Sequence, residues 1–150
     1  MEMVRFGLLT MLCLWPLTAA EFSLTIGNPI AANVPRMKAA GLAVRLENCG
    51  DLSKSTLTGT GEGLAAGTRK SVPLQIMAST TPGVYALGLG SPLQGPWVAD
   101  VKATCGTVRA GAIVPFRGVI FIREAVKVFP RFATEAEVEN SLKEQLGGPK

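Results

Sequence analysis

Apolar and polar residues alternate along most of the chain beyond residue 20, with the period of two that is typical of half-buried β-strands. The clearest alternation lies in residues 83–105, where two apolar runs flank a turn rich in glycine and proline. One face of the first run carries Tyr85, Leu87 and Leu89. One face of the second run carries Trp97, Ala99, Val101, Ala103 and Cys105. We expect two antiparallel strands joined directly by that turn.

The same alternation predicts strands on both sides of this segment. They cover residues 21–27, 41–49, 55–60, 69–78, 108–116, 119–122 and 126–129. The glycine-rich stretch 59–67 is expected to be a loop or a distorted edge, and Pro73 favours an edge position because proline cannot donate to a ladder. Short strands separated by turns predict an all-β fold, an immunoglobulin-like antiparallel β-sandwich over residues 21–130.

The pattern changes to helical spacing in residues 131–150. Thr134 and Glu137 form a capping box, in which each side chain can accept a hydrogen bond from the other residue's backbone amide. Val138, Leu142 and Leu146 then recur at helical spacing, and Gly147, Gly148 and Pro149 end the helix. We expect a short amphipathic α-helix and a tail. The helix either covers its own sheet or docks on a partner.

Residues 1–20 differ from the rest in composition. An apolar run from Phe6 to Leu17 ends in the small residues Thr18, Ala19 and Ala20, which is the layout of a secretory signal peptide cleaved after Ala20. The run is shorter than the roughly 20 residues of a spanning helix. We therefore expect an exported, periplasmic or extracellular protein with no membrane span after signal cleavage. An uncleaved anchor is the alternative.

Two cysteines, Cys49 and Cys105, remain after cleavage, and an even number in an exported domain predicts a disulfide. The strands that end at these residues are the second and the sixth, so an up-and-down arrangement brings them to the same pole. Cys49 is out of phase with the apolar positions of its strand and requires a bulge or a turn before it. Closing this loop would stabilise the fold by about 4 kcal/mol in the entropy model.

Neither the charge nor the amino-acid composition of the chain indicates a catalytic residue, a cofactor or a metal site. The net charge is +4, but the basic residues are scattered, so we expect no nucleic-acid partner and at most a weak preference for anionic surfaces. The chain has no histidine, which removes the usual general base and the commonest zinc and copper ligand. Copper(I) bound by Met37 and Met77 is less plausible than packing. Tyr85 and Trp97 are expected to anchor the core, with a sugar or peptide platform as the alternative.

The spacing Gly83-x-Tyr85 followed by Pro92-x-x-Gly95-x-Trp97 and Val101 resembles the closing strands of small bacterial exported immunoglobulin-like domains. The YtkA-like group is nearest, with FixH-like proteins next. The resemblance implies a tyrosine and a tryptophan packed inside a sandwich, and an extracytoplasmic location. It assigns no active site.

These features predict a non-enzymatic exported module that binds or scaffolds an unidentified protein or envelope polymer. A fimbrial or pilus-type structural subunit is the alternative, although such subunits end on a strand and this chain is predicted to end on a helix. A small glycan hydrolase using carboxylates alone is a third hypothesis, for which no pair of acids stands out in the sequence.

Overall fold

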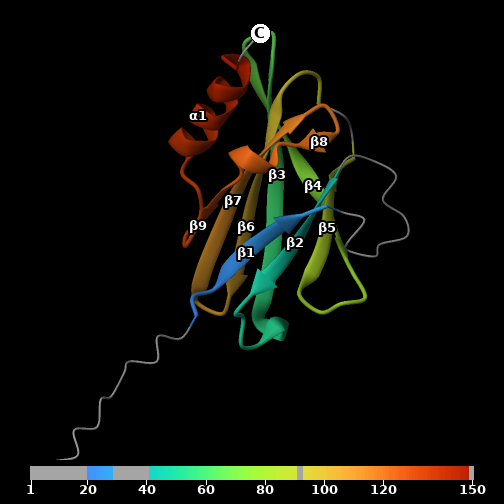
Figure 1. Ribbon diagram of the computed structural model, residues 1–150, viewed down its shortest axis with the longest axis vertical. Coiled ribbons are helices and arrows are strands. Elements are labelled where there is room, and N and C mark those ends of the chain that lie inside the picture. Colours follow the sequence, from blue (N-terminus) through green and yellow to red (C-terminus); the bar gives the residue numbers. More distant parts are fainter. Residues whose placement is uncertain (1–19, 29–40, 91–92, 149–150) are drawn as a thin grey trace, which may run out of the picture.

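The computed structural model describes residues 20–28, 41–90 and 93–148. The predicted signal peptide, apart from Ala20, lies outside these ranges, as do Met37 and Pro92. Within them, the elements follow one another as shown in Figure 1. They are β1 (Ser23–Gly27), β2 (Gly41–Glu47), η2 (Leu52–Lys54), β3 (Ser55–Ala65), β4 (Thr68–Ala78), β5 (Val84–Leu89), β6 (Trp97–Cys105), β7 (Val108–Arg117), β8 (Ile120–Phe121), η3 (Arg123–Ala125), β9 (Lys127–Phe129) and α1 (Glu135–Leu146).

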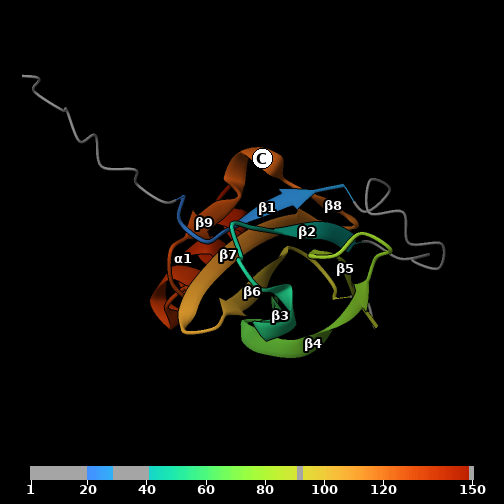
Figure 2. The ribbon, with the colours of Figure 1, turned by 90° about the horizontal axis from the view of Figure 1, so that it is seen from below.

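The strands form one antiparallel sheet in the order β1-β2-β5-β4-β3-β6-β7-β8, with β9 also paired to β7. Strand β4 links the two halves, since residues 68–73 pair with β3 and residues 74–78 pair with β5. The sheet curls until β1 lies close to β7 and β9 (Figure 2). An all-β fold with a short C-terminal helix is therefore confirmed. Two stacked immunoglobulin-like sheets are not shown, because the pairing runs continuously around the curl.

The two strands of residues 83–105 are present, but the expectation that they pair directly is wrong. Strand β5 pairs with β2 and β4, whereas β6 pairs with β3 and β7. The β3–β4 hairpin separates them; Ala66 and Gly67 both have positive φ at its tip, as a two-residue type I′ turn requires. Alternation within a strand identifies its faces, but the partner depends on pairings made by distant segments.

The expectation of a loop in residues 59–67 is also wrong, because β3 runs unbroken to Ala65 between β4 and β6. Its glycines leave room for apolar side chains inside the curl. A Cβ atom on Gly59 would lie 2.8 Å from Leu74 Cδ1, and one on Gly61 would lie 2.6 Å from Leu89 Cδ2. Glycine in a strand interior often marks such close approach. Pro73 lies on β4 where the strand changes partner from β3 to β5, which suits a residue without an amide donor.

Trp97 lies in the interior of the curl, where its side chain is surrounded by apolar residues from both halves of the sheet. It is 2% exposed and stacks on Phe116, with ring centroids 4.0 Å apart. Its Nε1 donates a hydrogen bond to the Gly118 carbonyl at 3.0 Å. Tyr85 lies at the margin of the same interior and is half-buried.

Helix α1 packs on the outer face of the sheet, over β3, β6 and β7 (Figure 1). The predicted capping box between Thr134 and Glu137 is present. Val138 and Leu142 are buried in a second apolar cluster with Val98 and Ile113 of the sheet. The helix therefore covers its own sheet.

Truncation of Trp97 is expected to destabilise the whole domain. Trp97→Ala removes the stacked ring and leaves a cavity, so the free energy of unfolding should fall by about 3–5 kcal/mol. Trp97→Phe keeps an aromatic ring against Phe116 and should cost clearly less. Denaturant unfolding followed by circular dichroism measures both. A Trp97→Ala protein as stable as wild type would contradict the interior placement.

The crossing of residues 131–133 over β7 depends on Gly111. A Cβ atom there would lie 2.7 Å from the Arg131 carbonyl oxygen and 3.1 Å from the Ala133 nitrogen. Because backbone must move to admit it, Gly111→Ala should lower the free energy of unfolding by about 1–3 kcal/mol. Gly27→Ala is the matched control, since nothing lies within 4 Å of its added Cβ, and it should stay within about 0.5 kcal/mol. Equal effects of the two substitutions in thermal melts would contradict this packing.

Candidate functional site

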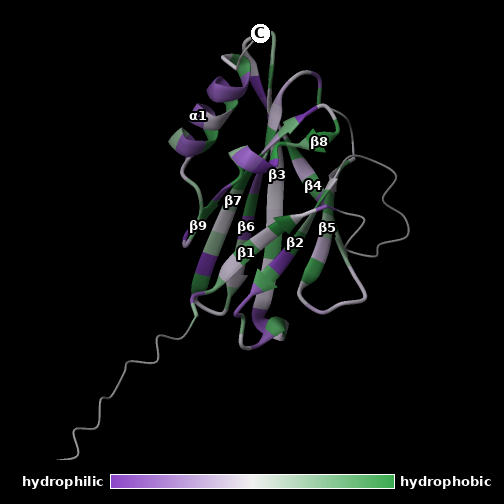
Figure 3. Cartoon of the chain, viewed as in Figure 1, coloured by the Kyte–Doolittle hydropathy of each residue, from purple (hydrophilic) through white to green (hydrophobic). Residues whose placement is uncertain are grey.

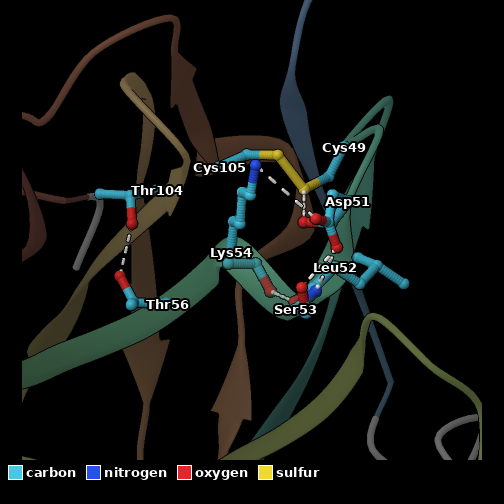
Figure 4. Close-up of a disulfide and its surroundings, with 9 residues drawn as sticks. Cys49, Asp51, Leu52, Ser53, Lys54, Thr56, Thr104 and Cys105 are labelled. Atoms are coloured by element: carbon cyan, nitrogen blue, oxygen red, sulfur yellow. Dashed lines mark hydrogen bonds and ion pairs between the residues drawn. A yellow bond between two sulfur atoms is a disulfide. The ribbon is translucent and has the colours of Figure 1, made fainter.

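The two predicted cysteine partners meet at one pole of the sheet (Figure 4). Cys105 ends β6, and Cys49 follows Asn48, whose φ of 60° turns the chain just after β2. The turn resolves the phase problem that the sequence raised at Cys49. The Cα atoms lie 5.8 Å apart and the sulfur atoms are at disulfide distance.

The segment next to this cysteine pair is held by short-range hydrogen bonds. Asp51 Oδ1 accepts from the Ser53 amide at 3.0 Å and from the Ser53 hydroxyl at 2.6 Å, which starts the short helix η2. Thr56 and Thr104 share a hydrogen bond between β3 and β6 (Figure 4). These contacts give the pole a structural role, because the side chains of Asp51 and Ser53 and those of Thr56 and Thr104 are paired within it.

A second polar cluster lies beneath the first turn of α1, on the outer face of β3 and β6. It contains Glu62 and Asp100, which are 5% and 3% exposed and are the buried acids of the described ranges. Thr60 is the register partner of Asp100, so Glu62 lies two residues further along the neighbouring strand on the same face. This cluster was not predicted from the sequence, because a half-buried strand exposes its second face to solvent, and for β6 that is the face opposite Trp97. Apolar Val98 and Ile113 on the outer face were the available sign that something covers it.

Glu62 is fully engaged by neighbouring donors. Its carboxylate accepts hydrogen bonds from Thr60 Oγ1 at 2.7 Å, from Ser71 Oγ at 2.8 Å and from Arg69 Nε at 2.9 Å. Burial acts to raise the pKa of Glu62, but these hydrogen bonds and the guanidinium charge outweigh it, so the pKa lies below 4.5. Arg69 also lies 2.9 Å from Glu135 in the first turn of α1. The Glu62–Arg69–Glu135 chain therefore ties the helix to the sheet.

The carboxylate of Asp100 has fewer hydrogen-bond partners than that of Glu62. Its Oδ2 lies 3.2 Å from Lys102 Nζ, while Oδ1 is buried without a hydrogen-bond partner in the described part of the chain. Burial raises the pKa of Asp100 above 3.8, the Lys102 charge partly opposes this, and the negative charges of Glu62 and Glu135 add to it. The two buried carboxylates thus differ in protonation behaviour, as the members of an acid–base pair do. Their cover by α1 and the three donors on Glu62 give them a structural role here.

A recess of about 250 Å³ lies near the β3–β4 hairpin, and its lining consists of Gly63, Leu64, Ala65, Lys70, Leu93 and Gln94. The residues described hold no group of three or more histidine, cysteine, aspartate or glutamate side chains placed to bind a metal ion. None of the helices in these ranges is long and apolar enough to cross a membrane.

Comparison of the chain with protein-family models finds no match, and comparisons with curated proteins and with solved structures find no significant match. The resemblance to YtkA-like and FixH-like domains therefore stays a prediction.

The two buried acids should respond to pH in opposite directions. The folded state holds the Asp100 proton more tightly than the unfolded chain does, so its contribution to stability is greatest below pH 3.8 and is lost as pH rises through the raised pKa. Asp100→Asn should therefore raise the free energy of unfolding at neutral pH. Glu62 contributes above pH 4.5, and this is lost as pH falls through the lowered pKa. Glu62→Gln should cost about 2 kcal/mol at neutral pH.

Urea unfolding at a series of pH values, followed by the fluorescence of Trp97, measures both effects. Glu47→Gln is the control, because Glu47 is partly exposed on β2 and its ion pair with Arg45 is long, at 4.0 Å. An Asp100→Asn protein that is less stable than wild type at neutral pH would show that the Lys102 ion pair outweighs the cost of burying the charge.

Proposed function

We propose that the chain is exported and acts as a non-enzymatic module that binds or scaffolds another component of the cell envelope. The N-terminal layout supports export, and the cysteine pair at disulfide distance suits an oxidising compartment. On this proposal the chain works in the periplasm or outside the cell, and its partner is a protein or an envelope polymer.

The observation that carries the binding role is that the ion pairs and hydrogen bonds around Glu62 and at the start of α1 hold the scaffold together. Glu62, Arg69 and Glu135 join the sheet to the helix, and Thr134 and Glu137 cap that helix. A scaffold fixed in this way presents its turns in constant positions, and recognition is commonly placed on such loops.

Three of the turns lie together at the pole opposite the cysteine pair. Trp97 on β6 pairs with Gly63 on β3 and with Phe116 on β7. The chain reversals next to these three residues therefore occur at one end of the sheet. These reversals are Ala66–Gly67, Gly95–Pro96 and Gly118–Val119. Of the stretch 59–67 that was expected to be a loop or a distorted edge, the tip of the hairpin lies at this pole. We propose this pole as the binding surface.

A fimbrial or pilus-type subunit is the second candidate. It has less support because the chain continues after its last strand into α1, whose Val138 and Leu142 are buried against the same sheet. The immunoglobulin-like resemblance of residues 83–105 is compatible with either role and is retained here as part of the proposal.

A photo-crosslinking residue at Gln94 is expected to capture the partner in intact cells. Gln94 is exposed at the proposed binding pole, and Ser53, exposed at the cysteine pole, is the matched control position. We expect one discrete adduct from Gln94 and none from Ser53, because loops at one pole carry recognition. Gel electrophoresis and mass spectrometry of envelope fractions identify the adduct. Equal labelling from both positions, or none from either in correctly exported protein, would contradict the proposal.

A further inference from the structure

The hairpin that joins β7 to β8 exposes two aliphatic side chains at its tip. Val119 is 67% exposed and Ile120 is 70% exposed, the highest values among the large apolar side chains of the described residues. The hydrophobic colouring of β8 marks this position in Figure 3. The two residues follow one another in the chain and lie at the proposed binding pole.

The turn itself does not require apolar residues. Arg117 pairs with Ile120, so Gly118 and Val119 are the two turn residues, and Gly118 has a φ of 61°. Glycine with positive φ at the first of two turn positions is typical of a type II′ hairpin, whose second position is usually small or polar. Val119 therefore exposes apolar surface that the geometry of the turn does not require.

The tip is rigidly supported from beneath. Trp97 Nε1 donates to the Gly118 carbonyl at 3.0 Å, and the Ile122 amide donates to the Pro115 carbonyl at 2.8 Å. Phe121 packs edge-on against the ring of Phe116. The aromatic side chains of this region thus face the interior, and the aliphatic ones face outward.

Two cations flank the aliphatic tip. Arg117 and Arg123 are exposed, and neither makes an ion pair with another described residue. The Arg123 guanidinium lies over the Phe121 ring at 5.8 Å, which holds it beside the hairpin. Glu124 is the nearest acid along the chain, and it follows the hairpin in η3. The tip therefore combines exposed aliphatic groups with positive charge on both sides.

We propose that the β7–β8 hairpin docks on the surface of an anionic lipid bilayer. Val119 and Ile120 enter the boundary between headgroups and acyl chains, while Arg117 and Arg123 contact lipid phosphates. The proposal rests on the envelope location proposed above. It adds a lipid contact of the β7–β8 tip to the partner contact that is proposed for the turn around Gln94 at the same pole.

Charge and side-chain type favour a bilayer over a protein partner. Apolar insertion combined with arginine or lysine near the surface is the way in which peripheral proteins bind anionic membranes. Protein interfaces are centred on exposed tryptophan, tyrosine and arginine anchors. Here the aromatic residues Trp97, Phe116 and Phe121 are directed inward, so the tip exposes aliphatic groups and arginines without an aromatic anchor. The net charge of +4 acts in the same direction.

Vesicle co-sedimentation tests the proposal on the mature chain that begins at Glu21. We expect binding to vesicles of mixed phosphatidylglycerol and phosphatidylcholine, weaker binding at high salt and little binding to phosphatidylcholine alone. Val119→Thr combined with Ile120→Thr should weaken binding about tenfold or more, since it removes the inserted apolar groups. Arg117→Gln and Arg123→Gln should each weaken it about fivefold.

Matched controls lie at the other end of β7. Val108 is 47% exposed beside the β6–β7 turn, so Val108→Thr repeats the chemical change away from the tip and should leave binding unchanged. Arg109, which lies over Phe132 as Arg123 lies over Phe121, supplies the control Arg109→Gln. Unchanged thermal transitions of all variants exclude loss of fold as the cause.

Several results would overturn the proposal. One is a folded wild-type protein that does not bind anionic vesicles, and another is a double threonine variant that binds them as tightly as wild type does. A third is a wild-type dimer, detected by light scattering, that becomes a monomer in the double threonine variant. The last result would identify a second copy of the chain as the occupant. A protein adduct from the Gln94 crosslinker without vesicle binding would refute the bilayer and leave the envelope-binding role standing.

Discussion

The fold depends on the close approach of leucine side chains to the glycines of β3. Leu74 and Leu89 occupy space that a Cβ atom on Gly59 or Gly61 would fill. Strand β3 pairs with β4, the strand that links the two halves of the sheet. With bulkier residues at these positions, the interior side chains of β4 and β5 would be held away from β3. The sheet could then not curl tightly enough around Trp97 and Phe116. Trp97 and Phe116 contact each other because they are register partners on β6 and β7, and the curl is what encloses their rings.

The outer face depends on a different balance, between the cost of burying charge and the hydrogen bonds that offset it. Glu62 receives three donors and becomes the link through which Arg69 holds the start of α1. Asp100, on the neighbouring strand β6, forms an ion pair with Lys102 through one carboxylate oxygen, and its other oxygen has no partner among the described residues. Val138 and Leu142 supply the apolar contact of the helix with the sheet, so the polar cluster sets the position of the helix N-terminus and does not carry its docking alone.

The two poles of the sheet consequently differ in character. One is closed by the cysteine pair and the hydrogen-bonded turn around Asp51. The other gathers three chain reversals and exposes Val119 and Ile120 between two arginines. This difference between the poles is what supports the proposed fixed orientation of the chain against an envelope surface.

Local sequence determined the elements and their faces: the period-two runs predicted the inward side of β6, the cysteine count predicted the pair, and the capping box predicted α1. The strand faces and the capping box depend on residues a few positions apart, so they can be read along the chain. The cysteine pair spans 56 residues and was predicted from the even cysteine count. Only the tertiary structure decided that β5 and β6 are not neighbours, that the glycines of β3 lie in a central strand, and that Glu62 and Asp100 meet under a helix. Each of these depends on segments distant in sequence. The same alternation or the same glycine is compatible with several partners until packing and buried charge select one of them.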